Sequence, residues 1–218
     1  MTLALFDLDN TLIGADSDYL WGEYLVARKL VDVQAYQKTN QAFYQDYVDG
    51  ALDAAAYLRF ALAPLAEFEP SKLQELHTEF MREYIDPIWL TEAEALVEKH
   101  KSAGHQVIVV TATNRFIVEP IVRRFGIEEL ICPEPEMQNG RYTGNFVGPT
   151  CFAEGKVEKM ALWLQNNNAS LEEDSWFYSD SHNDLPLLEK VTNPVAVDPD
   201  AKLRSIAKER NWPIISLR

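Results

Sequence analysis

Several features are scarce in this sequence of 218 residues. It has only two cysteines, Cys132 and Cys151, which form no CxxC pair and cannot build a disulfide framework, so we expect free thiols in a reduced compartment. No apolar run approaches the roughly 18 residues that a membrane-spanning helix needs. The first apolar run has no basic flank and meets Asp7 too early to form the core of a secretion signal. We therefore expect a cytoplasmic protein.

Positive charge is also scarce, because 20 lysines and arginines stand against 34 aspartates and glutamates, a net charge of −14. Such a surface repels nucleic acids and anionic membranes, so neither is an expected partner. If the substrate is itself an anion, a bound divalent metal and a few placed basic residues must attract it locally. A small molecule is the expected partner, and the oligomeric state stays open.

The chain begins with an apolar run, residues 3–6, that ends in Asp7 and Asp9. The run predicts a strand buried on both faces, as in parallel sheets covered by helices. Ligands of open α/β sheets bind at the carboxyl ends of the strands, so the two acids form a candidate site. Residues two apart in an extended segment point the same way, and paired like charges are costly without a nearby cation. The alternative is two solvated loop acids, one of them capping the next turn.

Residues 16–86 have a different character, with no β-branched apolar run and with aromatic and aliphatic residues at helical spacing. Gly50, Pro64 and Pro70 punctuate the pattern. It predicts four helices, which we call the helical insert, and for most of its aromatic residues it predicts a place in the core.

From residue 87 onward, strand and helix patterns alternate. The expected strands are residues 106–110, 127–132, 176–178, 195–197 and 214–215. The expected helices are residues 91–103, with Thr91 as N-cap, 114–125, 154–166, 184–189 and 200–210. A hairpin over residues 137–145 should turn at Asn139-Gly140. The alternation predicts an α/β fold, a Rossmann-like doubly wound parallel sheet formed by residues 1–15 and 87–218, with residues 16–86 inserted as an α-helical cap domain.

Polar residues follow three of the expected strands: Asp7 and Asp9, Thr111 and Thr113, and the run Asp180 to Asp184. The carboxyl ends of parallel strands meet at one edge of the sheet, and Lys156 adds a cation just inside a helix. Together they supply a metal site, a nucleophile, a hydroxyl with backbone donors and a fixed cation, as phosphoryl transfer requires. Considered alone, Lys156 would be interpreted as a solvated helix lysine and Thr111 as a helix cap. The hypothesis of a phosphoryl-transfer site therefore depends on the occurrence of all these residues together and in this order.

Four segments resemble the motifs of the haloacid dehalogenase superfamily: the DxDxT run 7–11, the strand ending at Thr111, the helix lysine Lys156 and the SDSHND run 179–184. They occur in the family's order, and an insertion directly after the first motif resembles the phosphoserine phosphatase type, subfamily IB. The resemblance implies a C1-type helical cap and a Mg²⁺-dependent phosphomonoester hydrolase.

Carried over to this chain, the resemblance implies that Asp7 is the nucleophile and forms an aspartyl-phosphate. Asp9 would protonate the leaving alkoxide and then deprotonate the attacking water. Asp7, the main-chain carbonyl of Asp9, and Asp180 would hold Mg²⁺, with Asp184 a ligand or directly behind one.

The resemblance also implies that Thr111 and the Ala112 amide bind the transferred phosphoryl group. Lys156 would neutralise developing charge and orient Asp7. Asn183 would bind a phosphoryl oxygen or steady its loop, and His182 is expected to be a loop histidine.

The helical insert would exclude water and contact the leaving group. Asp16, seven residues after Asp9, stands where phosphoserine phosphatases carry an acid that pairs with the substrate amine. Arg59 is a candidate for a carboxylate or phosphate contact. Phosphoserine and histidinol phosphate are both expected substrates, and the choice stays open.

Two departures from the family pattern put phosphoserine itself in doubt. Residues 111–113 are Thr-Ala-Thr where phosphoserine phosphatases carry Ser-Gly-Gly, and the fourth motif carries serine where Gly-Asp-Gly is usual.

Four other functions are alternatives to this interpretation. A phospho-receiver would be about half as long and would not need Asp9, and a carbon-halogen hydrolase would lack that acid, so Asp9 argues against both. A phosphotransferase would share every motif. A phospho-ligand-binding or regulatory protein of the same fold would have lost turnover, against which the complete motif set argues.

Overall fold

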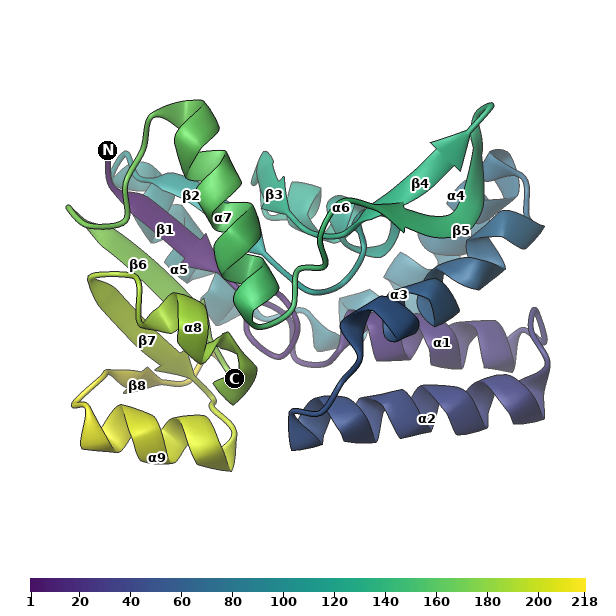
Figure 1. The fold of residues 1–218 in the computed structure, drawn as a ribbon, viewed down its shortest axis with the longest axis horizontal. Helices are drawn as coiled ribbons and strands as arrows, with labels where there is room; N and C mark the ends of the chain where they lie inside the picture. Colours follow the sequence, from purple (N-terminus) through teal and green to yellow (C-terminus); the bar gives the residue numbers. More distant parts are fainter.

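Six parallel strands form the centre of the protein, in the order β3-β2-β1-β6-β7-β8 (Figure 1), in a computed structural model that describes residues 1–218. Their bounds are β1 Leu3–Phe6, β2 Gln106–Val110, β3 Glu129–Ile131, β6 Ser175–Ser179, β7 Asn193–Val197 and β8 Ile214–Ile215. The predicted parallel sheet is confirmed. The order reverses at β1, whose neighbours β2 and β6 lead to opposite edges of the sheet.

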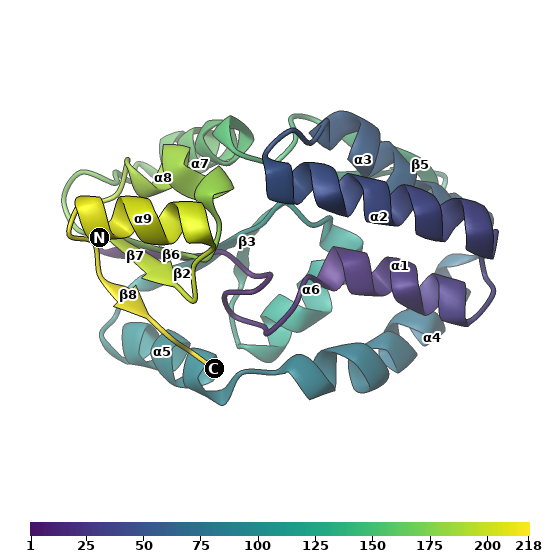
Figure 2. The same ribbon diagram turned by 90° about the horizontal axis from the view of Figure 1, so that it is seen from below.

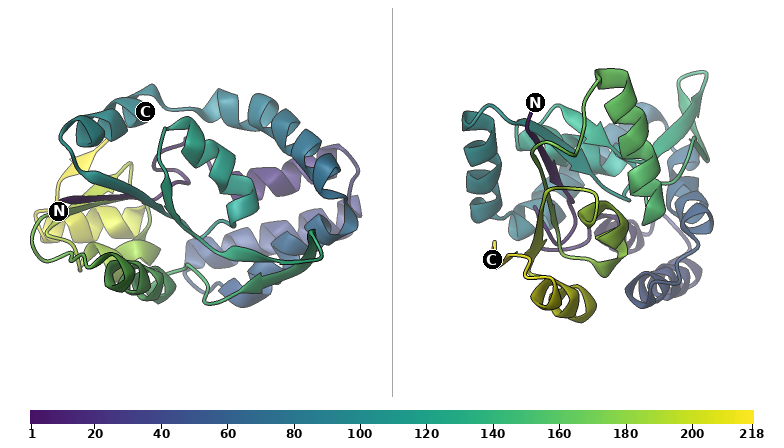
Figure 3. Two further views of the ribbon diagram at one scale, coloured as in Figure 1. Left: turned by 90° about the horizontal axis from the view of Figure 1, so that it is seen from above. Right: turned by 60° about the vertical axis from the view of Figure 1, so that its left-hand side comes forward.

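Helices cover both faces of the sheet, which explains why β1 is entirely apolar and fully buried. Leu3 and Leu5 pack on the side of α7 (Glu154–Asn167), α8 (Leu185–Leu188) and α9 (Ala201–Glu209). Ala4 and Phe6 pack on the side of α5 (Thr91–Ser102) and α6 (Arg115–Arg124). Figures 2 and 3 show the sheet between these two layers.

The helical insert contains the four predicted α-helices, which lie beside the sheet (Figure 1). They are α1 Ser17–Ala27, α2 Val33–Asp49, α3 Ala54–Leu62 and α4 Pro70–Phe80, the last extended by a π-helical turn, Met81–Ile85. Short 3₁₀ turns follow α3 at Ala63–Glu67, close the insert at Asp86–Ile88 and precede α8 at His182–Asp184. The side chains of Asp16, Asp32 and Asp53 accept backbone N–H bonds at the starts of α1, α2 and α3, which are stable N-caps.

The chain enters and leaves the insert at adjacent points. Ile13 and Trp89 form an isolated antiparallel bridge, and the Gly14 amide donates to the Ile88 carbonyl at 2.8 Å. The two connections between sheet and insert therefore lie side by side.

A hairpin from the sheet side contacts the insert at a second place. Its strands are β4 Glu134–Gln138 and β5 Arg141–Val147, and β5 packs against α3. The turn at Asn139-Gly140 has φ of 52° and 77°, the left-handed conformation that the predicted hairpin turn requires. The Arg59 guanidinium lies over the ring of Phe146 in β5, 5.5 Å from its centroid.

The predicted N-cap of α5 is wrong. Leu90, not Thr91, is the N-cap residue of α5, and no side chain caps this helix. Thr91 is already helical, and Glu92 and Glu94 in the first turn complement the positive end of the helix dipole instead.

Both cysteines are free thiols, as expected, and both are buried. Burial raises the pKa of the Cys151 thiol to about 12, so it stays protonated at neutral pH. No helix of the structure has the length and apolar character needed to cross a membrane.

A buried histidine gives the fold a predictable pH dependence. His100 of α5 shares hydrogen bonds of 2.8 Å with the Tyr178 hydroxyl and the His105 ring, and burial, followed by the charge of His105, lowers its pKa to about 4. Between about pH 6.5 and 4 the unfolded chain binds a proton that the folded chain does not, so the free energy of unfolding falls as pH drops through this window.

The variant His100→Gln should lack this contribution. Urea unfolding at pH 7 and pH 5 should show the parent losing more stability than the variant. Equal losses would mean that His100 titrates alike in both states.

Candidate active site

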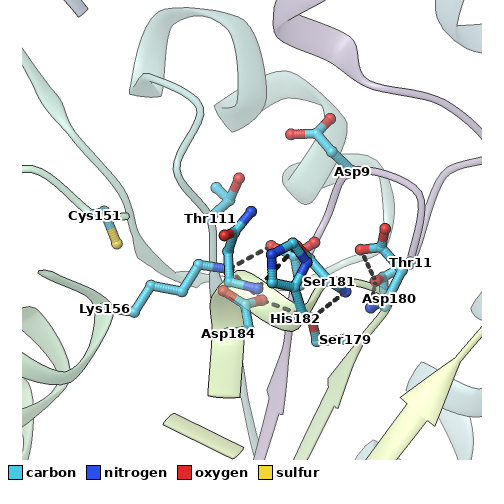
Figure 4. A network of polar contacts seen from close by, with 12 residues as sticks. Asp9, Thr11, Thr111, Cys151, Lys156, Ser179, Asp180, Ser181, His182 and Asp184 are labelled. Carbon is cyan, nitrogen blue, oxygen red and sulfur yellow. Dashed lines mark hydrogen bonds and ion pairs between the residues drawn. The ribbon is translucent and has the colours of Figure 1, made fainter. Parts of the chain in front are cut away.

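The site forms where β1, β2 and β6 end next to one another at the reversal of strand order. Asp7 follows β1, Thr111 follows β2 and Asp180 follows β6. All three sit at the same edge, where parallel sheets bind ligands. The structure thus brings together the three predicted strand ends, and Figure 4 shows Asp9, Thr111 and Asp180 around the same region.

Lys156 connects two of the carboxylates. Its Nζ donates to Asp7 Oδ1 at 2.7 Å and to Asp184 Oδ2 at 2.8 Å, and only 3% of its side chain is exposed. Burial lowers the pKa of Lys156, but the charges of Asp184 and Asp7 outweigh burial and leave it raised. Burial raises the pKa of Asp7 to about 7 against the opposing charge of Lys156. The lysine is therefore a fixed cation between two buried acids.

A tight turn before α7 places this lysine. Ala153 has φ 49° and ψ −118°, a conformation that is strained for a residue with a side chain. A Cβ on Gly155 would lie 2.6 Å from the Thr150 carbonyl oxygen, so only glycine fits there. The turn aims the first residues of α7 at Asp7.

Asp9 is held by two donors in a defined orientation. Its Oδ1 accepts from the Ser17 amide at 2.7 Å and its Oδ2 from the Thr113 hydroxyl at 2.8 Å. Burial, then the charge of Asp16, raises the pKa of Asp9 to about 6. A carboxyl with this pKa exchanges protons readily near neutral pH. Sequence reasoning missed this role of Thr113, although its i, i+2 spacing from Thr111 repeats that of Asp7 and Asp9.

The loop after β6 is fixed by hydroxyl groups. The Thr11 hydroxyl donates to Asp180 Oδ1 at 3.3 Å and accepts from the Asp180 amide at 3.1 Å. The Ser179 hydroxyl donates to Asp184 Oδ2 at 2.7 Å, and Asp184 lies between Ser179 and Lys156 in Figure 4. Ser179, one of the two serines that stand where the family pattern has glycine, thus orients an acid. Burial, followed by the charges of Asp7 and Asp184, raises the pKa of Asp180 well above its ordinary value.

The carboxylates of Asp7, Asp180 and Asp184 are close enough to feel one another's charge, and Lys156 is the cation among them. Three carboxyl groups beside a single ammonium group provide hard oxygen donors, which suit a divalent ion such as Mg²⁺. No three carboxylate, histidine or cysteine side chains converge at metal-binding distance as placed. Asp180 is bonded to Thr11, and the other two acids to Lys156. The donor chemistry fits a divalent ion, although the ligands are not gathered around one point.

The predicted phosphoryl-binding residues line the same cavity. Thr111 is buried, and its hydroxyl accepts from the Thr113 amide at 3.2 Å. Ala112 and Asn183 also line the cavity, and Asn183 Nδ2 donates to the Tyr47 carbonyl of α2 at 3.2 Å. His182 is a loop residue whose amide and Nδ1 both contact Asp200 Oδ2, at 2.7 and 2.8 Å.

The cavity extends from the strand ends into the helical insert and is lined by residues of both parts of the chain. Asp16 lines it while its Oδ1 accepts from the Tyr19 amide at 2.9 Å as the N-cap of α1. Asp18, which sequence reasoning missed, lines it too. The aromatic residues of the lining are Tyr19, Phe43, Tyr44, Tyr47, Tyr57 and Phe152. Arg59 is not part of the lining, because its guanidinium stacks on Phe146.

The chain is similar to known proteins in both sequence and structure. Residues 4–189 match the family model of haloacid dehalogenase-like hydrolases. A Neisseria meningitidis protein named histidinol-phosphatase is 45% identical over 99% of both chains. A Mycobacterium tuberculosis protein named phosphoserine phosphatase is 35% identical over 99% of this chain and 70% of its own. A solved Bordetella pertussis structure of unknown function matches with a TM-score of 0.93 and 42% identity, over 100% of this chain and 99% of its own.

The turn before α7 can be tested by Gly155→Ala. Helix propensity alone would make this change stabilising, but the contact with the Thr150 carbonyl should instead lower the free energy of unfolding by about 1 to 3 kcal/mol. The control is Ala161→Gly at an exposed position of the same helix, which should cost about 1 kcal/mol through propensity alone. Urea unfolding measures both. A more stable Gly155→Ala variant would show that the turn tolerates a side chain.

Proposed function

The chain belongs to the haloacid dehalogenase-like hydrolase family and is a phosphatase, and we propose that it hydrolyses histidinol phosphate through an aspartyl-phosphate on Asp7. The observation that favours histidinol phosphate as the substrate is the negative charge of the cavity lining. It contains the carboxylates of Asp7, Asp9, Asp16, Asp18 and Asp184 but only one cation, Lys156, which is already paired with two of them.

Asp7 is suited to attack phosphorus. Lys156 bonds its Oδ1, which leaves Oδ2 as the nucleophile in a fixed orientation. A new bond forms between Oδ2 and phosphorus as the bond from phosphorus to the ester oxygen breaks. Thr111 and the Ala112 amide bind the phosphoryl oxygens, and Lys156 offsets the charge that develops on them.

Asp9 transfers the protons. In its acid form it protonates the departing alkoxide, and the resulting carboxylate then takes a proton from the water that attacks the aspartyl-phosphate. The second attack breaks the bond between phosphorus and Oδ2 and regenerates Asp7. A pKa of about 6 lets Asp9 serve in both forms, and Ser17 and Thr113 keep it in place between the steps.

Asp7, the main-chain carbonyl of Asp9, and Asp180 would hold Mg²⁺, with Asp184 bound to it or directly behind. When bound, the ion neutralises charge and orients the phosphoryl group. The excess of negative charge among these acids supports its presence.

Two substrates appear in the names of the relatives, and the cavity has no free cation to bind the carboxylate that only one of them carries. Phosphoserine carries a carboxylate, which proteins bind with arginine or lysine. Arg59 lies against Phe146, outside the cavity lining, and Lys156 is committed to Asp7 and Asp184. Histidinol phosphate has an ammonium and an imidazole but no carboxylate, which suits an acidic, aromatic cavity. The relative with 45% identity carries the matching name.

Phosphate release from a panel of esters tests the proposal. With Mg²⁺, histidinol phosphate should give a kcat/KM at least about tenfold above phosphoserine, sugar phosphates and nucleotides, since phosphoserine adds a carboxylate to an acidic cavity and the other two classes carry no ammonium. A chelator should abolish turnover and added Mg²⁺ restore it. Asp7→Asn should lose more than about 1,000-fold, whereas Asp46→Asn, an exposed acid of α2, should match the parent. A preference for phosphoserine would overturn the substrate.

We expect the carboxylate of Asp16 to bind the ammonium group of the substrate. Asp16→Asn removes the charge but keeps an N-cap side chain for α1, so the fold should be preserved. We expect kcat/KM for histidinol phosphate to fall about 10- to 100-fold, with p-nitrophenyl phosphate changed less than about threefold. Arg59→Ala should leave both substrates within about twofold, because its side chain is outside the cavity. An equal loss on both esters in Asp16→Asn would contradict an ammonium contact.

A further inference from the structure

Asp18 is a buried acid without a partner. Only 5% of the residue is exposed, and neither carboxylate oxygen has a hydrogen bond. The Tyr57 hydroxyl is its polar neighbour, without the geometry of a full hydrogen bond. A buried polar group left unsatisfied is destabilising, so its presence requires an explanation.

Folding does not supply that explanation. Asp18 lies in the first turn of α1, where a negative charge is favourable, but Asp16 already provides the cap of this helix. No salt bridge reaches Asp18, and its side chain lines the cavity. Burial, followed by the charges of Asp16 and Asp9, raises its pKa well above the ordinary value. The carboxyl is therefore kept at a cost to stability in the wall of the substrate cavity.

The acids of the cavity form a sequence that leads away from the reacting centre. Asp7 and Asp9 are at the strand ends, and the charge of Asp16 acts on Asp9. Asp16 is the N-cap residue of α1 and Asp18 stands in the first turn of that helix, so Asp18 lies farther into the helical insert along the cavity wall. In histidinol phosphate the order is the same: phosphate, then ammonium one carbon beyond the ester carbon, then imidazole.

Resting on the proposed function, we infer that Asp18 is a specificity-determining residue that binds the imidazole ring of the substrate. Its carboxylate accepts a hydrogen bond from a ring N–H, and pairs with the ring charge when the imidazole is protonated. Tyr57 and Phe43, which contact each other edge to face at 5.3 Å between ring centroids, offer aromatic surface in the lining of the same cavity. Ligand binding then supplies the partner that Asp18 lacks.

Two substrates that differ only in the ring test this role. Phenylalaninol phosphate keeps the phosphate, the ammonium and an aromatic ring but has no ring N–H. The parent should prefer histidinol phosphate over it by about 10- to 100-fold in kcat/KM. Asp18→Asn should reduce that preference to within about threefold, by losing activity on histidinol phosphate alone. Asp46→Asn, the same change at an exposed position of α2, should keep the parent's preference.

Thermal unfolding distinguishes substrate binding from a structural role for Asp18, because the two roles predict opposite changes in Tm. Asp18→Asn removes an unpaired buried acid at constant volume, so its Tm should equal or exceed that of the parent. A lower Tm, or failure to fold, would show that the acid is structural and overturn the inference.

The two proposals fail in different measurements. In one outcome, the parent prefers histidinol phosphate in the ester panel while Asp18→Asn still prefers histidinol phosphate over phenylalaninol phosphate. That result would contradict the role of Asp18 and support the proposed function. If the parent does not prefer histidinol phosphate, the proposed function falls and this inference falls with it. A selective loss in Asp18→Asn with an unchanged or higher Tm supports both.

Discussion

The two hydrogen bonds of Lys156 to Asp7 and Asp184 are the constraint on which the rest of the structure depends. They join the end of β1 to the loop after β6 across a buried, acidic site, and an unpaired charge at this depth would be expensive. The strained Ala153, the obligatory Gly155 and the hydroxyl of Ser179 are all arranged around this one ammonium group. The chemistry proposed for Asp7 relies on the same contact, because it decides which carboxylate oxygen is free.

Much of the fold and of the reacting centre could be predicted from the sequence, for a physical reason. Strands buried on both faces must be apolar, so β1, β2 and β6 appear as short runs that end abruptly in polar residues. Parallel pairing then brings the ends of those runs together whatever the details of packing. Asp7, Thr111 and Asp180 therefore meet as expected, and the helical spacing of residues 16–86 was enough to predict four helices.

The part that could not be predicted depends on side-chain direction within the helical insert. Arg59 and Leu58 are adjacent in α3, yet Leu58 lines the cavity and Arg59 stacks on Phe146. That outcome depends on how β5 packs on α3, and the positions differ by one step of about 100° around the helix. Asp18 was missed for a similar reason, since a lack of hydrogen-bond partners is a property of the surroundings and leaves no pattern in the sequence.

The bridge between Ile13 and Trp89 places both connections of the helical insert at one point beside the sheet. A segment that leaves and returns at the same place can be exchanged for another of different length without disturbing the strand order. The strand ends that carry the proposed nucleophile and the helix that carries the proposed substrate contacts are thus separable parts of the chain. A different insert would change the substrate contacts without moving the strand ends.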